Sequence, residues 1–247
     1  MKTAIKYNRT AWAIGVAMVL FMSAAASYAG GNIDRDSNHA NVGALSAKWI
    51  QWAYAGPDGA NSIQDQTGEL CALNQPKKDI WFLAGSFNKT GVVRNCTIPA
   101  NRALFYPLIE GEWIDCPGTT DVDVPDVDAR KTISSYFDYP TLLTSTLDGV
   151  PISALQIPTV RVQSPKFTSV LPLGNIKGGC LDSSKEPAFV LPAGKTGRQF
   201  ADGYWVMLPP LTPGLHILNL HGASSVNSFE NEVTYNLTVL GDDHDKR

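Results

Sequence analysis

The carboxylates of this chain of 247 residues are concentrated between Glu110 and Asp128, a stretch that contains no basic residue. Oxygen-rich loops of this kind suit Ca²⁺, which takes about six to eight hard ligands. The stretch lacks the fixed glycine and the last glutamate of an EF-hand loop, so a site here would be irregular. The favoured interpretation is that these acids begin a helix, where carboxylates are stabilised, and calcium binding is the alternative. The candidate calcium ligands are Asp115, Asp121, Asp123, Asp126 and Asp128.

Glu110 and Glu112 lie two positions apart, so on a β-strand their side chains would share one face. Paired carboxylates act as acid and base in glycoside hydrolysis when they stand about 5 Å or more apart and one pKa is raised. The two glutamates are therefore the candidate catalytic pair. The alternative is two solvated acids near the end of a strand.

Tryptophan rings offer a second kind of chemistry, because an aromatic face can stack on a sugar ring. Trp81, Trp113 and Trp205 are the candidate ligand contacts if their side chains prove to be exposed, and core residues otherwise. Trp49 and Trp52 are spaced as on one face of a helix, and this pattern favours packing on a sheet over a sugar platform.

Residues 1–29 have the three parts of a secretory signal: a basic start, an apolar run and small residues before a cut after Ala29. Its removal takes away three basic residues and no acid, so the mature chain is more acidic than the net charge of −3 indicates. An acidic surface argues against a nucleic-acid partner. No later stretch is long and apolar enough to span a bilayer, so we expect a secreted or periplasmic protein without a transmembrane anchor.

Four cysteines in an exported chain predict two disulfides, for which three pairings exist. We favour Cys71 with Cys96 and Cys116 with Cys180, from their order along the chain. No two cysteines have the close spacing of a zinc site. Calcium is therefore the only cofactor that the sequence indicates.

Short strand-like segments, separated by some of the 16 prolines and 21 glycines, follow residue 78. In 232–240 apolar and polar residues alternate, as in a half-buried antiparallel strand. Asp148 and Gly149 form the two-residue signal of a hairpin turn. Helical spacing predicts one helix over 42–54 and a second after Pro125.

These elements predict a mainly β protein, an antiparallel β-sandwich or jelly roll with one or two short helices. The predicted parts are the signal 1–29, a flexible arm 30–41, a single domain 42–241 and a disordered tail 242–247.

Several segments resemble a family of secreted bacterial β-sandwich-like proteins that has no established activity. The matching segments are KWIQWAY (48–54), IWFLAGSF (80–87), RNCTIPANRALFYPLI (94–109), DGYWVMLPPLTPGLHILNLHG (202–222) and EVTYNLTVL (232–240). The resemblance implies export and a sandwich-like fold, and it transfers no site residue.

Three functions fit these observations. The first is a non-catalytic extracellular module that binds a glycan, an envelope component or a protein partner. The second is a secreted carbohydrate-active enzyme, a hydrolase or lyase, that uses the acids of 110–128. The third is a subunit of a surface filament or coat, assembled by strand exchange through the arm 30–41. Because sandwiches support all three, fold alone does not choose among them.

Overall fold

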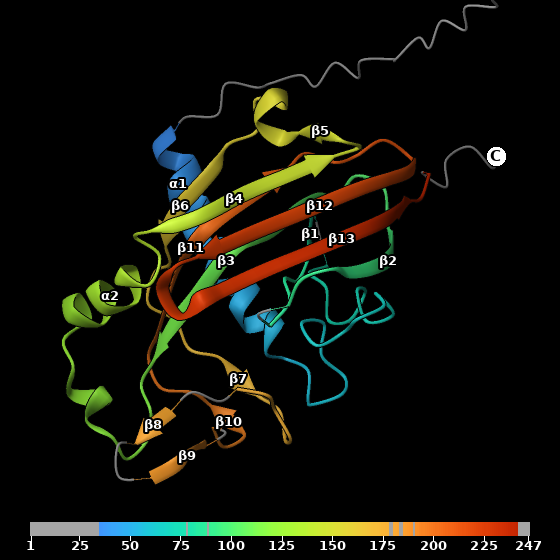
Figure 1. Ribbon diagram of the computed structural model, residues 1–247. Helices are drawn as coiled ribbons and strands as arrows, with labels where there is room; N and C mark the ends of the chain where they lie inside the picture. The colour runs from blue at the N-terminus through green and yellow to red at the C-terminus, as the bar shows by residue number, and fades with distance from the viewer. Residues whose placement is uncertain are drawn as a thin grey trace, which may run out of the picture. The chain divides into compact units, whose positions relative to one another are not determined.

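Two β-sheets packed face to face form the centre of the molecule in a computed structural model (Figure 1). The structure describes residues 35–77, 79–87, 89–177, 180–182, 185–189 and 191–241. The predicted signal 1–29 and tail 242–247 lie outside them. The prediction of a mainly β, sandwich-like protein is confirmed.

The first sheet has four strands in the order β1-β3-β11-β6. Their bounds are Ile80–Phe82 for β1, Ala103–Ile114 for β3, Gln199–Leu208 for β11 and Thr159–Gln163 for β6. The second sheet has five strands in the order β2-β13-β12-β4-β5. Their bounds are Val92–Ile98 for β2, Phe229–Val239 for β13, Gly214–Ser224 for β12, Pro140–Leu147 for β4 and Val150–Pro151 for β5.

Two short hairpins lie apart from these sheets. The first pairs β7 (Val170–Leu171) with β10 (Gly194–Lys195), and the second pairs β8 (Cys180–Asp182) with β9 (Lys185–Phe189).

Most strand pairs are antiparallel, as predicted, but β1 with β3 and β2 with β13 are parallel. The chain reaches β3 from β1 by way of β2, which lies in the other sheet. A crossover of this kind brings the third strand back parallel to the first. These two pairs join segments that are not adjacent in the chain order, so local alternation could not indicate their direction.

Period-two alternation builds the core between the sheets. In β13 every second residue is buried, and Val233, Tyr235 and Leu237 point inward. They meet Leu104 and Leu108 of β3 from the other sheet in one apolar cluster. Burial of these side chains is the main stabilising contribution at this layer.

Helix α1 (Arg35–Ala53) covers the outer face of the first sheet, behind it in Figure 1. Trp49 and Trp52 are 1% and 7% exposed and pack in the cluster beneath the helix, so the packing interpretation is confirmed. The helix begins before the predicted start at 42, so 35–41 of the predicted arm is helical. No glycine or proline interrupts the chain between 35 and 42, and the helix therefore extends beyond its apolar stripe.

Helix α2 (Asp126–Ser135) follows Pro125, as predicted, after a short 3₁₀ turn over Thr120–Asp123. Its buried residues Ala129 and Ile133 pack against β3 and β11.

The hairpin between β4 and β5 has the predicted turn, because Asp148 and Gly149 both have positive φ, 52° and 78°. The strand β5 that follows this turn stops at Pro151, which lacks the N–H that continued pairing needs. A 3₁₀ turn over Ile152–Leu155 follows, and another over Val226–Ser228 precedes β13.

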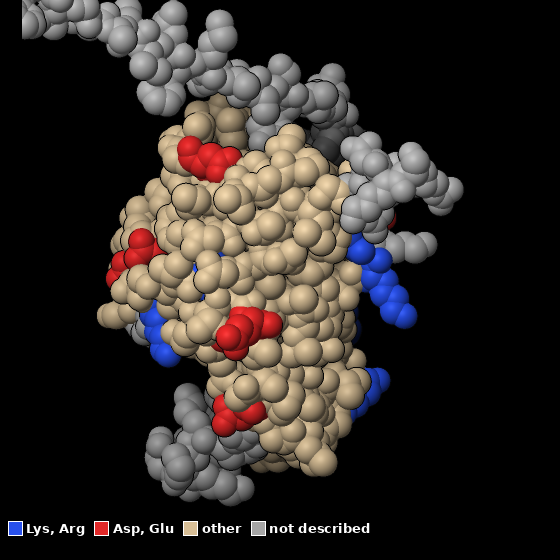
Figure 2. All heavy atoms as spheres, turned by 90° about the vertical axis from the view of Figure 1, so that its right-hand side faces the viewer, with Lys and Arg blue, Asp and Glu red and all other residues tan. Residues whose placement is uncertain are grey.

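Charged side chains are spread over the face drawn in Figure 2. Acidic groups stand apart from one another on mostly uncharged surface, and the visible basic groups lie near its edges. Among the described helices, none has the length and apolar character that crossing a bilayer requires.

Candidate functional site

A cavity opens where the pairing of β1 with β3 ends. The parallel pairing covers only Ile80–Phe82 against Ala103–Phe105, and beyond it this edge of β3 has no described strand beside it. The cavity, of about 230 Å³, lies beside that edge. It is lined by Trp49 and Tyr54 at the end of α1, by Ile63, by 85–87, by 107–112 of β3, and by Lys177, Phe229 and Asn231.

A β-bulge decides which face of the sheet the two glutamates occupy. The register between β3 and β11 shifts between Tyr204 and Trp205, and Leu108 is the extra residue of β3. Before the bulge, even-numbered residues such as Leu108 face the core between the sheets. After it, Glu110 and Glu112 face the side of α1 and line the cavity.

A glycine opposite the bulge leaves room for the glutamates. Gly203 of β11 pairs with Glu110. A Cβ at Gly203 would lie 2.5 Å from the carbonyl oxygen of Ile109 and 2.8 Å from the Cβ of Glu110. Only a residue without a side chain fits there.

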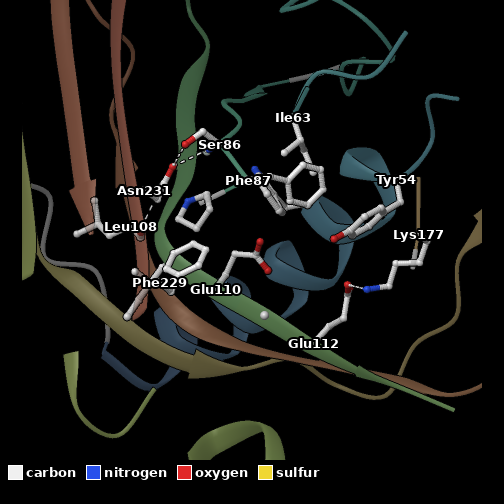
Figure 3. A pocket seen from close by; sticks show the side chains of 15 residues that line it. Tyr54, Ile63, Ser86, Phe87, Leu108, Glu110, Glu112, Lys177, Phe229 and Asn231 are labelled. Carbon is white, nitrogen blue, oxygen red and sulfur yellow. Dashed lines mark hydrogen bonds and ion pairs between the residues drawn. The ribbon is translucent and has the colours of Figure 1, made fainter. Parts of the chain in front are cut away.

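Asn231 holds the bulge from the other sheet. This residue is only 2% exposed, and its Nδ2 donates to the carbonyl of Leu108 at 3.1 Å. Its Oδ1 accepts from the backbone N–H of Ser86 at 2.6 Å. One amide therefore connects β13, the bulge of β3 and the segment 85–87, all of which border the cavity (Figure 3).

Glu112 forms an ion pair with Lys177, and the two side chains are only 3% and 11% exposed. The ammonium of Lys177 also lies 4.7 Å from the ring centre of Tyr54. The second oxygen of Glu112, Oε2, is buried, and no described donor meets full hydrogen-bonding geometry with it, although the Tyr54 phenol is near enough to interact with this carboxyl group. A buried acceptor without a donor costs about 1–3 kcal/mol, so this oxygen is a point at which a ligand or water can bind.

Burial raises the pKa of Glu110 from 4.5 to about 8, with a further contribution from the charge of Glu112 and a smaller opposing one from Lys177. Burial and the nearby carboxylates also raise the pKa of Tyr54 well above 10, so its phenol keeps its proton. At neutral pH the cavity thus holds a protonated Glu110, a protonated Tyr54 and the Glu112–Lys177 pair. Figure 3 shows the Tyr54 hydroxyl directed toward the carboxylates.

Comparisons of the chain with known proteins found no match. No family model matches the chain, and no curated protein or solved structure does so either. The resemblance to secreted bacterial sandwich proteins stays a prediction.

The structure brings Glu110 and Glu112 together on one face of β3, but it places the three tryptophans apart from them. Trp81 and Trp205 are 6% and 1% exposed core residues, so the condition for ligand contact is not met for either. Trp205 stacks on Phe105 at 5.1 Å between ring centres. Trp113 is half-buried and donates through Nε1 to Asp115 at 3.0 Å.

Two of the candidate calcium ligands, Asp115 and Asp126, form ion pairs with basic side chains. Arg198 binds Asp115 at 2.9 Å and also pairs with Asp126, which Lys166 contacts as well. The hydrogen bond from Arg198 lowers the pKa of Asp126 below its usual value. Asp121 and Asp123 lie in the 3₁₀ turn, and Asp126 and Asp128 lie in the first turn of α2. Within the described part of the chain, no three acids, histidines or cysteines are grouped to hold a metal.

The disulfide between Cys71 and Cys96 is confirmed, with 5.9 Å between the Cα atoms. Cys116 is also disulfide-bonded. The side chain of Cys180 lies outside those described, so the second pairing stays a prediction.

Sequence reasoning missed Tyr54, Lys177 and Asn231 as residues of the cavity. They reach it from positions far apart in the chain, and no local pattern marks them. One signal for the bulge was available. Pro107 lies inside a strand-like apolar run, just beyond the end of β1, and proline inside a strand indicates a bulge or an unpaired edge.

Proposed function

We propose that this protein acts outside the cytoplasm, secreted or in the periplasm, as a non-catalytic module that binds a glycan in the cavity beside β3. The supporting observation is the buried Oε2 of Glu112, which has no described donor in full hydrogen-bonding geometry and belongs to a residue that lines the cavity. A sugar hydroxyl can donate a hydrogen bond to this oxygen and, through its own oxygen, accept a hydrogen bond from the protonated carboxyl of Glu110.

The charge balance of the cavity favours a neutral polar ligand. The charges of Glu112 and Lys177 oppose each other, and Glu110 is uncharged below its raised pKa of about 8. Tyr54 and Phe229 add aromatic surface to the wall. A small cavity with an apolar wall and a few convergent polar groups is typical of a specific ligand site. Sugars combine hydroxyl groups with an apolar ring face and suit both features.

A glycan array, followed by calorimetric titration of the glycans that it retains, tests the proposal. The exported protein is used after signal removal by the expression host. We expect Glu112→Gln to weaken binding at least about tenfold, because the variant loses an anionic acceptor. The matched control is Glu69→Gln at an exposed glutamate outside the cavity, which we expect to bind as the wild type does. Wild-type protein that retains no glycan would refute the proposal.

Hydrolysis of a glycosidic bond is a second candidate, supported by the different states of the two carboxyls. Glu110 keeps a proton up to about pH 8, whereas Glu112 is ion-paired. A general acid and an ionised partner of this kind are what glycosidases use. Glu110 would protonate the leaving oxygen, and Glu112 would activate water or attack the sugar.

Turnover distinguishes the two candidates. Reducing-end release from a bound glycan, abolished by Glu110→Gln with binding retained, would establish hydrolysis and exclude the non-catalytic role. Binding without release over long incubation supports the first proposal.

A further inference from the structure

A second cavity adjoins the first and shares part of its wall. It has a volume of about 370 Å³ and is lined by 58–59, Ile63, Gln64, Gln66, Phe87 and Lys89. Ile63 and Phe87 line both cavities. The two spaces therefore meet at this apolar pair, and a ligand that fills the first extends toward the second.

Phe87 is unusual among the residues around the cavities because a large aromatic side chain is 42% exposed there. The adjacent Ile63 is only 4% exposed. An exposed aromatic face at the junction of two cavities is suited to stacking on the apolar face of a sugar ring. Burial of that face by a ligand would remove apolar surface from water.

The polar groups of the second cavity are held in place before any ligand binds. The Nε2 of Gln64 donates to Oδ1 of Asp58 at 2.8 Å, and its Oε1 accepts from the backbone N–H of Gly59 at 3.1 Å. The Nε2 of Gln66 donates to the carbonyl of Gln64 at 3.0 Å. Such preorganised amides and a carboxylate present donors and acceptors to hydroxyl groups without a further loss of side-chain entropy.

The segment that carries these groups is fixed to the sandwich by a buried arginine. Arg94 of β2 is 1% exposed, and it donates to the carbonyls of Asp65 at 2.7 Å and Ile63 at 3.0 Å. It also donates to the carbonyl of Ala84 at 2.8 Å, close to the segment that carries Phe87. One guanidinium therefore fixes both walls, so the spacing between the two cavities is set by the fold.

From this juxtaposition we infer that the two cavities are neighbouring subsites for one oligosaccharide, with one sugar unit beside Glu112 and the next beyond Phe87. This inference rests on the proposed glycan binding. The ligand is accordingly a neutral chain of at least two units.

Titration with a monosaccharide and with the di- and trisaccharides of the same sugar tests the inference. We expect the disaccharide to bind at least about tenfold more tightly than the monosaccharide, since each added contact of this kind lowers the dissociation constant. We expect Gln64→Ala and Phe87→Ala each to reduce that ratio toward one. Gln51→Ala, at an exposed glutamine outside both cavities, is the matched control and should keep the wild-type ratio.

The outcomes separate the inference from the proposed function. Equal affinity for mono- and disaccharide, or an unchanged ratio in both variants, would overturn the second subsite while glycan binding stands. Failure of every sugar to bind would overturn both. Thermal unfolding of each variant checks that the fold is kept, and Phe87→Ala provides an independent reading if Gln64→Ala disturbs its segment.

Discussion

Glu110 shows how much a single residue depends on its surroundings. The same carboxyl at an exposed position would be ionised at neutral pH, but burial beside Glu112 keeps its proton to about pH 8. Lys177 opposes this effect because its positive charge favours the ionised form. Prediction of the pair as a candidate site was feasible from spacing alone. The division of roles between its members required knowledge of burial and of a partner 65 positions away.

The raised pKa of Glu110 predicts a pH-dependent stability. Between 4.5 and about 8 the folded state keeps a proton that the unfolded state has released, so the free energy of unfolding falls as pH rises through this window. The slope is at most about 1.4 kcal/mol per pH unit. The variant Glu110→Gln cannot titrate at this position, so its free energy of unfolding should depend less on pH. Relative to wild type, its free energy of unfolding should therefore rise as pH rises.

Urea unfolding at pH values below, inside and above that window measures the effect. Glu69→Gln is the control, because its side chain is exposed, and it should keep the wild-type slope. Parallel profiles for wild type and Glu110→Gln would contradict the assigned pKa.

At the scale of the element, the bulge in β3 decides the site. One extra residue, Leu108, moves Glu110 and Glu112 from the face that packs between the sheets to the face that borders α1. Without it, two carboxyls would enter an apolar core at a large desolvation penalty. The strand itself could be predicted from its apolar residues. The face toward which its last side chains point could not be predicted, because a shift of one residue moves every following side chain to the opposite face of the sheet.

The close approach of β11 to the bulge predicts a sensitive glycine. In Gly203→Ala the new Cβ would contact the carbonyl of Ile109 and the Cβ of Glu110, and β3 would have to move. We expect the free energy of unfolding to fall by about 1–3 kcal/mol, the range for overpacking, and glycan binding to weaken with it. Gly241→Ala is the matched control, since its Cβ would meet no atom within 4 Å.

Urea midpoints of the two variants, measured with the slope of each transition, give this comparison. A Gly203→Ala protein as stable as Gly241→Ala would show that β3 and β11 are not packed as closely as described.

At the scale of the whole molecule, the sandwich is closed by contacts between the two ends of the domain. β2, near the start, pairs in parallel with β13, near the end. The disulfide from Cys71 to Cys96 ties the segment before β1 to that same β2. The segment 56–66, which has no helix or strand of its own, is thereby held close to the sheet that anchors it.

Replacement of both Cys71 and Cys96 by alanine should lower the free energy of unfolding by about 3–4 kcal/mol, because a loop closed over 25 residues restricts the unfolded chain. Denaturant unfolding of this double variant measures the loss without reduction of the disulfide that includes Cys116. A loss below about 1 kcal/mol would mean that the unfolded chain is already restricted in this region.

Some features of this protein follow from local sequence, and others only from tertiary structure. Alternation in 232–240, the Asp148–Gly149 turn and the stripe of Leu45, Trp49 and Trp52 each depend on neighbouring residues, so their elements were predictable. The cavity depends on where β1 ends, on one extra residue in β3, and on side chains such as Asn231 that arrive from the far end of the chain. A sequence records which side chains exist, but burial, pKa and pairing are properties of what surrounds them, and only folding determines those surroundings.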